Sequence, residues 1–242
     1  MALNLVMLGP PGAGKGTQAE RFAREHGIPK VSTGDILREA VHGGTDLGEK
    51  VRVVMERGEL VGDDLMIGIV RERLMRPDAA AGFVLDGFPR TAAQANALDE
   101  ITAARGPVIC VEIQVPDEEL VRRVRGRRVC DDCGANADAF EHLPNMLPPL
   151  CQNTERCRAV GPKWVARSDD SEDVVRERLK IYWRDTRPMI EYYSARPTFR
   201  AIDGLQSPVQ VREALVSAVA SALGQPPGQL RSLAKKNMGL QA

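Results

Sequence analysis

The sequence predicts an α/β fold built on a doubly wound parallel sheet. Four short apolar segments, at residues 3–8, 83–85, 108–113 and 199–202, have the composition of strands that are buried on both faces. Between them lie stretches with the apolar spacing of amphipathic helices. Strands that alternate with helices favour a parallel sheet covered on both sides. Such sheets bind ligands at the carboxyl ends of their strands.

The composition favours a globular protein of one domain with insertions, since the chain has 242 residues. Its 33 basic and 33 acidic residues cancel, so there is no bulk attraction for nucleic acid or an anionic membrane. Arginine supplies 26 of the 33 basic residues, which reflects either codon composition or a need for bidentate phosphate contacts. No segment approaches the ~20 apolar residues of a membrane span, and the N-terminus lacks a signal region. We therefore expect a cytoplasmic protein with reduced cysteines.

A first helix is expected directly after the first strand and a glycine-rich loop. Ala19, Phe22, Ala23 and His26 mark one face of this helix. Gly27 is expected to end it.

Three later helices have recognisable starts. Asp63 or Asp64 can cap the helix that follows, and Asp117 can cap another. Ser207 followed by Pro208 combines a good N-cap with proline at the first helical position.

The loop after the first strand has the pattern of a phosphate-binding loop. It reads GPPGAGKGT over residues 9–17 and lies between a strand and a helix, as that motif requires. Its backbone N–H groups can surround a phosphate chain, with Lys15 as a mobile cation and the Thr17 hydroxyl beside Mg²⁺. The motif normally has Ser or Thr directly after the lysine, where this chain has Gly16. The alternative is a glycine-rich turn beside a surface lysine.

Two further segments carry candidate phosphate ligands. The apolar strand that ends in Asp86 suits a carboxylate that holds a water of a Mg²⁺ shell, and Arg90 follows four residues later. In residues 32–38, Thr33 can be a helix N-cap and Arg38 points away from the apolar face of that helix. The alternatives are a turn with an exposed Arg90 and a solvated Arg38.

Together these segments closely resemble the adenylate kinase family. The motifs that carry the resemblance lie at residues 9–17, 33–38, 86–90, 126–129 and 167–170. The match extends from Met1 to about residue 224.

The resemblance implies transfer of the γ-phosphoryl group of Mg-ATP to AMP, giving two ADP. The catalytic residues that it implies are Lys15, Arg90, Arg127, Arg167 and Arg178. The implied ATP-binding residues are Gly12, Ala13, Gly14, Lys15, Gly16, Thr17, Arg123 and Arg127. The implied AMP-binding residues are Thr33, Arg38, Val61, Gly87, Arg90, Gln94, Arg167 and Arg178. Asp86 then serves the second shell of Mg²⁺, and Arg123 stacks on the ATP adenine.

Helix spacing alone also argues for Arg178. A helix that starts near residue 171 has its apolar positions at Val174, Val175, Leu179, Tyr182 and Trp183. Arg178 lies four residues after Val174 and four before Tyr182, so it falls on the same stripe. A buried charge is costly unless it is paired. We interpret Arg178 as a phosphate ligand, with an arginine that reaches out to solvent as the alternative.

Gln94 has two interpretations. Residues 91–94 have the pattern of a capping box, in which Gln94 would reach back to the Thr91 amide. The resemblance instead makes Gln94 an adenine contact for AMP, because an amide offers one donor and one acceptor. We favour the adenine contact.

Four of the five cysteines lie in the stretch 129–166 and suggest a structural Zn²⁺ site. The expected ligands are Cys130, Cys133, Cys151 and Cys157. Family members with a long lid often carry such a zinc site, but their second pair is separated by two residues and this one by five. The alternatives to Cys157 are Thr154, His142 and Asp131, and a lid without metal is a further alternative. Cys110 lies in an apolar strand and is expected in the core.

The resemblance divides the chain into a core, an AMP-binding helical segment and a lid. The core comprises residues 1–31, 62–125 and 171–224, the AMP-binding segment 32–61, and the lid 126–170. Residues 225–242 are expected to be a mobile tail.

The resemblance also favours a monomer. A pyrimidine nucleoside monophosphate kinase is the nearest alternative, but those relatives have a short lid. A nucleotide-dependent switch is a further alternative. It needs no second nucleotide site, so it would not explain why Arg38, Arg90 and Gln94 occur together.

Overall fold

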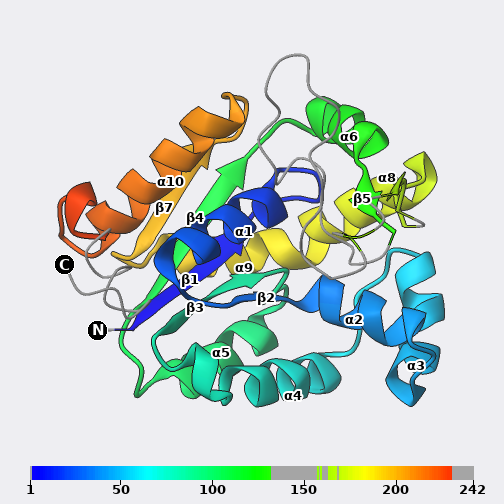
Figure 1. Cartoon of the computed structure of the whole chain (residues 1–242), viewed down its shortest axis with the longest axis horizontal. Coiled ribbons are helices and arrows are strands. Elements are labelled where there is room, and N and C mark those ends of the chain that lie inside the picture. Colours follow the sequence, from blue (N-terminus) through cyan, green and yellow to red (C-terminus); the bar gives the residue numbers. More distant parts are fainter. Residues whose placement is uncertain (1, 132–156, 158, 160–162, 168, 231–242) are drawn as a thin grey trace.

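The computed structural model describes residues 2–131, 157, 159, 163–167 and 169–230. Within them a five-stranded parallel sheet has the order β2-β3-β1-β4-β7 (Figure 1). The strands are β1 (Leu3–Leu8), β2 (Lys30–Ser32), β3 (Gly82–Asp86), β4 (Val108–Gln114) and β7 (Phe199–Asp203). The parallel sheet and its place at the centre of the molecule confirm the predicted fold class.

The two faces of the sheet carry separate apolar cores, because successive side chains of a strand point to opposite faces. Leu5 and Met7 of β1 pack in one core with α1 (Lys15–His26) and α10 (Pro208–Ala222). Val6 and Leu8 pack in the other core with α4 (Asp63–Leu74), α5 (Ala92–Thr102) and α9 (Arg187–Ser194). Helices therefore cover both faces, which is the doubly wound arrangement.

The helix ends follow the sequence signals only in part. Gly27 ends α1 in the left-handed conformation, with φ of 61°, and Ser207 forms a complete capping box at α10. However, α4 is preceded by Gly62, and Asp63 lies inside its first turn without capping it. Likewise Pro116 precedes α6 (Asp117–Gly126), so Asp117 is not an N-cap. Acidic residues in a first turn stabilise the helix through its dipole without a capping bond.

The AMP-binding segment expected at residues 32–61 forms two helices, α2 (Thr33–His42) and α3 (Asp46–Glu56). They lie beside the sheet end from which the phosphate-binding loop emerges (Figure 1). The N-cap of α2 is Ser32, whose hydroxyl accepts from the Asp35 amide, so Thr33 is the first helical residue and not the cap. The two helices approach closely, since a Cβ on Gly48 would lie 2.1 Å from the Ala40 carbonyl oxygen.

Two expectations about burial are wrong. β7 is an edge strand in which only Ile202 is buried, so it is not buried on both faces. Trp183 does not join the apolar stripe of α8 (Glu172–Ile181), because its side chain is 46% exposed. A π-helical turn, Tyr182–Thr186, follows α8 and leads into α9. This turn changes the helical phase, so spacing counted through it fails.

The segment after α6 contains a two-stranded antiparallel sheet, β5 (Val129–Cys130) with β6 (Trp164–Val165). Cys110 is buried in β4, as expected. At the other end of the chain, Leu230 is fully buried in the core that contains α10. Residues 226–229 before it are exposed, and 231–242 lie outside the described residues, so the mobile tail at 225–242 stays a prediction. No described helix has the length and apolarity needed to cross a membrane.

Candidate active site

A cleft of about 1640 Å³ opens at the carboxyl ends of β1, β2 and β3. Most of the candidate site residues line it: Gly12, Ala13, Gly14, Lys15, Gly16, Thr17, Arg38, Asp86, Gly87, Arg90, Arg123, Arg127, Arg167 and Arg178. Cys130 also reaches its wall. Thr33, Val61 and Gln94 do not line the cleft. Cys133 and Cys151 lie outside the described residues.

The phosphate-binding loop wraps around its own lysine. The Lys15 ammonium donates to the Gly9 and Pro10 carbonyl oxygens, both at 2.8 Å. Burial lowers the pKa of Lys15 to about 8, and only the nearby Asp86 carboxylate opposes this effect among the largest causes. Gly12 needs its positive φ of 87°, and a Cβ there would come within 2.8 Å of Val124. The loop therefore presents a partly desolvated cation at the floor of the cleft.

Gly16, which departs from the usual loop pattern, faces Asp86. A Cβ at this position would lie 3.2 Å from Asp86 Oδ2, which is a crowded contact. Asp86 stands at the carboxyl end of β3, where its strand neighbour is Met7 of β1. The glycine thus lets the carboxylate approach the loop. Thr17, the next hydroxyl, starts the buried side of α1.

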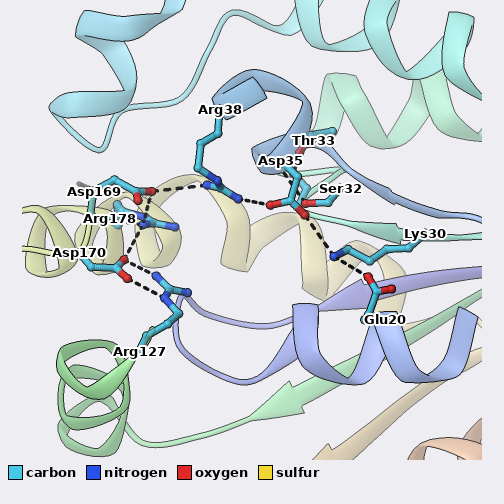
Figure 2. A network of polar contacts seen from close by, with 11 residues as sticks. Glu20, Lys30, Ser32, Thr33, Asp35, Arg38, Arg127, Asp169, Asp170 and Arg178 are labelled. Atoms are coloured by element: carbon cyan, nitrogen blue, oxygen red, sulfur yellow. Dashed lines mark hydrogen bonds and ion pairs between the residues drawn. The ribbon is translucent and has the colours of Figure 1, made fainter. Parts of the chain in front are cut away.

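Three arginines of the cleft are paired with aspartates (Figure 2). Arg127 holds Asp170 with two hydrogen bonds, one of them from Nε at 2.7 Å. Arg178 lies 3.1 Å from Asp169 Oδ2 and 3.8 Å from Asp170. The Asp170 side chain is only 4% exposed. These ion pairs hold the end of α6, the residues just before α8, and α8 itself close together.

Arg38 joins this cluster to the helices of residues 32–61. Its guanidinium lies 2.5 Å from Asp35 and 3.6 Å from Asp169. Asp35 also pairs with Lys30 at 3.1 Å, and Lys30 pairs with Glu20 (Figure 2). Burial would raise the pKa of Asp35, but Lys30 and Arg38 outweigh it and hold this pKa well below its usual range. Asp35 is therefore a carboxylate that organises two cations.

Arg90 and Arg167 form no ion pair with a described residue. The Nε of Arg90 donates instead to the Gly87 carbonyl oxygen at 2.8 Å. Burial, followed by the nearby Arg178, lowers the pKa of Arg90 to about 10. Burial, followed by Arg38 and Arg127, lowers the pKa of Arg167 to about 10. Both groups stay cationic at neutral pH, and neighbouring cations make an anion between them favourable.

Gln94 lies beside this group of cations, 2% exposed. Its Oε1 accepts from the Arg90 backbone N–H at 2.8 Å, and its Nε2 donates to Asp63 at 2.8 Å. Only half of the alternative capping box forms. The Thr91 hydroxyl accepts from the backbone N–H of Gln94, but the Gln94 side chain accepts from the Arg90 backbone N–H and not from that of Thr91. Thr33 donates to the Gly87 carbonyl oxygen at 3.0 Å.

The guanidinium of Arg123, which also lines the cleft, is fixed by two hydrogen bonds. Its Nε donates to Glu119 at 2.7 Å and its Nη2 donates to the Gly204 carbonyl oxygen at 2.8 Å. Both contacts lie in the plane of the guanidinium, so its faces remain available for stacking.

The thiols of Cys130, on β5, and Cys157 lie side by side. Their Sγ atoms are 3.5 Å apart, both side chains are buried, and neither forms a disulfide among the described residues. Two thiolates of a tetrahedral zinc site lie about 3.8 Å apart, since each Zn–S bond is about 2.3 Å. The described residues contain no group of three metal-binding side chains. The alternative ligand Asp131 pairs with Lys163 at 3.8 Å.

Four acidic residues of the site were not predicted: Asp35, Asp63, Asp169 and Asp170. Asp35, Asp169 and Asp170 lie inside the quoted motifs. Asp170 pairs with Arg127, 43 positions earlier in the sequence, whereas Asp35 pairs with the nearby Lys30 and Arg38. The only sequence signal was the nearby arginines, which need counter-charges when no substrate is bound.

A parallel sheet, a glycine-rich loop with a lysine after β1, and arginines from several segments define a P-loop nucleotide phosphotransferase. The sequence profile of the family described as Adenylate kinase matches residues 7–198. The adenylate kinase of Archaeoglobus fulgidus is 48% identical over 84% of this chain and 91% of its own length. That of Rhizobium etli is 44% identical over 91% of this chain and 100% of its own. That of Trichlorobacter lovleyi is 45% identical over 90% and 99%.

The chain therefore belongs to the adenylate kinase family. It is an enzyme of ATP:AMP phosphotransfer, which gives ADP, and adenylate kinases use Mg²⁺ with ATP.

Proposed function

We propose that the cleft holds ATP and AMP end to end, with the transferring phosphoryl group between Lys15, Arg90, Arg127, Arg167 and Arg178. The observation that carries this proposal is the gathering of these cations, from five separate segments, on the walls of one cleft. Phosphoryl transfer needs little covalent help from the protein. It needs two nucleotides in line and neutralisation of the charge on the transferred group.

On the ATP side, residues 12–17 surround the phosphates through their backbone N–H groups and Lys15. The faces of the Arg123 guanidinium suit stacking on the adenine. Mg²⁺, when bound with ATP, neutralises phosphate charge, and Thr17 and Asp86 are the groups placed to hold its hydration shell. The position of Asp86 beside Gly16 supports this assignment.

On the AMP side, Arg38 and Arg90 grip the phosphate, and Arg167 and Arg178 close over it. Gln94 reads the adenine, and Thr33, Val61 and Gly87 form the rest of this subsite. The uncompensated charge of Arg90 beside Gly87 supports the phosphate assignment.

We propose the same three parts as the resemblance implies: a core, the segment 32–61, and a lid at 126–170. Asp169 lies between Arg38 of α2 and Arg178 of α8. When substrate phosphates replace it, both arginines turn to the same anion and draw the parts together. Closure then shuts water out of the phosphoryl transfer.

We propose a structural Zn²⁺ in the lid, held by Cys130, Cys133, Cys151 and Cys157. The buried Sγ–Sγ separation of 3.5 Å between Cys130 and Cys157 supports Cys157 as a ligand. The metal would join two loops of the lid and supply stability there, at a distance from the phosphoryl transfer.

We further propose that the enzyme acts as a monomer in the cytoplasm and engages neither nucleic acid nor membranes. Its balanced charge, 33 basic against 33 acidic residues, supports the absence of bulk attraction to polyanions. Sedimentation at working concentration tests the monomer, and a sedimentation coefficient of a stable dimer would contradict it.

Incubation with Mg-ATP and a panel of monophosphates tests the substrate assignment. We expect AMP to be the preferred acceptor, with two ADP formed for each AMP consumed. Comparable turnover of CMP or UMP would favour the pyrimidine nucleotide kinase alternative. ATP binding without any acceptor turnover would favour a nucleotide-dependent switch.

A further inference from the structure

The Gln94 side-chain amide is held at both of its polar atoms by the protein itself. Nε2 donates to Asp63 Oδ1 at 2.8 Å, and Oε1 accepts from the Arg90 backbone N–H at 2.8 Å. The side chain is 2% exposed, so water does not compete with these partners.

Chemistry allows only one orientation of this amide. A carboxylate can only accept a hydrogen bond, and a backbone N–H can only donate one. A half-turn of the amide would set its oxygen against the Asp63 carboxylate and its NH₂ group against the Arg90 N–H. Both contacts would then be repulsive, in a buried place where such contacts are costly.

Asp63 is itself held in place. Its Oδ2 accepts from the Thr91 hydroxyl at 2.9 Å, while Oδ1 receives Gln94. The same hydroxyl accepts from the Gln94 backbone amide at 3.2 Å. Asp63 stands in the first turn of α4, where the helix dipole favours its charge. The carboxylate is thus a fixed reference that connects α4 to the start of α5.

The orientation decides what the amide can offer to a ligand. After its two internal contacts, Nε2 keeps one N–H and Oε1 keeps one lone pair, in a fixed order. The Watson–Crick edge of adenine presents an acceptor at N1 and a donor at N6 in the complementary order. A 6-oxopurine presents the reverse, an N1–H donor and an O6 acceptor, so it needs the half-turned amide.

We propose that Asp63 is a specificity-determining positioning residue: by locking the Gln94 amide it makes the acceptor site select adenine over 6-oxopurine monophosphates. This inference rests on the proposed role of Gln94 as the adenine contact, which requires AMP to reach an amide that is buried outside the cleft in this structure. Asp63 does not touch the nucleotide; it acts through Gln94.

The test compares AMP with IMP, which differs from AMP only in the donor and acceptor order at positions 1 and 6. We expect Asp63→Ala to lower the AMP-to-IMP ratio of kcat/KM about tenfold, the size expected for losing one bidentate base discrimination. Asp63→Asn keeps an acceptor oxygen but can rotate, so its ratio should be intermediate. Asp64→Ala, at an exposed neighbour in the same turn, is the matched control and should keep the wild-type ratio.

This ratio does not depend on the folded fraction, because both substrates meet the same enzyme preparation. A purely structural role of Asp63 would lower both kcat/KM values together and leave the ratio unchanged, which would overturn the inference. Gln94→Leu separates the two proposals. If it abolishes selectivity while Asp63→Ala does not, only the inference fails. If Gln94→Leu leaves the ratio unchanged, the role of Gln94 and the inference both fail.

Discussion

The cleft holds its cations in two different ways. Arg127 and Arg178 are paired with buried aspartates, whereas Lys15 and Arg90 are held by backbone carbonyl oxygens. Carbonyl oxygens satisfy hydrogen bonds without cancelling charge. Burial lowers the pKa of Lys15 to about 8 and that of Arg90 to about 10, and it also lowers the pKa of the paired Arg178. The paired arginines must exchange a partner to bind phosphate. Lys15 and Arg90 have no ion-pair partner among the described residues and would gain one in a phosphate, so we expect them to attract the substrate.

The largest effect should come from removing an unpaired cation. We expect Arg90→Ala to lower turnover by about 10²–10³-fold, the usual loss for one charge-assisted contact to a developing anion. Its stability should be unchanged or higher, because a buried uncompensated charge disappears. A coupled ADP assay and a thermal melt measure the two quantities. Arg184→Ala, at an exposed arginine outside the cleft, is the control. Near-normal turnover of Arg90→Ala would contradict the assigned role.

Removing a paired arginine should affect both properties. Among the described residues, Arg127→Ala leaves the buried Asp170 with only Arg178 as an ion-pair partner, at 3.8 Å. We therefore expect a stability loss on the order of 3 kcal/mol together with a large loss of turnover. Arg127→Ala combined with Asp170→Ala should recover stability and not turnover. Denaturant unfolding of the single and double variants measures this. Equal free energies of unfolding for Arg90→Ala and Arg127→Ala would contradict the expected difference between a cation bound by carbonyl oxygens and one paired with an aspartate.

The zinc site that we propose for the lid would be the opposite case, because a cation would there be held by a group of anions. We expect one equivalent of Zn²⁺ in the purified enzyme by elemental analysis after zinc-replete expression. Removing it should lower Tm by roughly 5–10 °C, as a loss of 2–3 kcal/mol would, and leave activity at low temperature. Cys157→Ser should loosen the metal, while Thr154→Ala should not. Less than about half an equivalent of metal would count against the site.

The smallest effect is a pH dependence from Lys15. Its folded pKa of about 8 lies below the unfolded value of 10.5, so between these values the unfolded chain binds more protons and stability rises with pH. The charge that binds ATP is lost over the same range. We expect kcat/KM for ATP to fall about tenfold from pH 7 to pH 9, while Tm rises. Lys15→Arg should remove both trends, and a flat wild-type profile would contradict the low pKa.

Much of the fold could be predicted because its signals are local. The apolar runs of β1, β3 and β4 and the loop of residues 9–17 are contiguous in sequence. β2 was missed, since Lys30–Ser32 is too short to form an apolar run. Trp183 was misplaced because the π-helical turn at Tyr182–Thr186 changes the phase of the helix. A fixed helical period cannot detect such a turn.

The site could be predicted only on its cationic side. Lys15 stands in a glycine-rich loop after one strand, and Arg90 follows four residues after Asp86 at the end of another, so both carry a local signal. Their acidic neighbours act across the fold: Asp63 contacts Gln94 from 31 residues away. Sequence alone predicts the same outcome for Arg90→Ala and Arg127→Ala, a large loss of turnover with little loss of stability. The structure separates them because only Arg127 leaves a buried carboxylate behind.

The burial of Cys110 has a practical consequence for chemical labelling. Its side chain is 1% exposed, and burial raises the pKa of its thiol to about 12. The thiolate is the form that reacts with thiol reagents, so we expect Cys110 not to react in the native enzyme. Every thiol that a colorimetric reagent counts in the folded protein then belongs to residues 130–157. A maleimide dye or a mass-shift experiment therefore reports on that segment alone, without any cysteine having to be removed first.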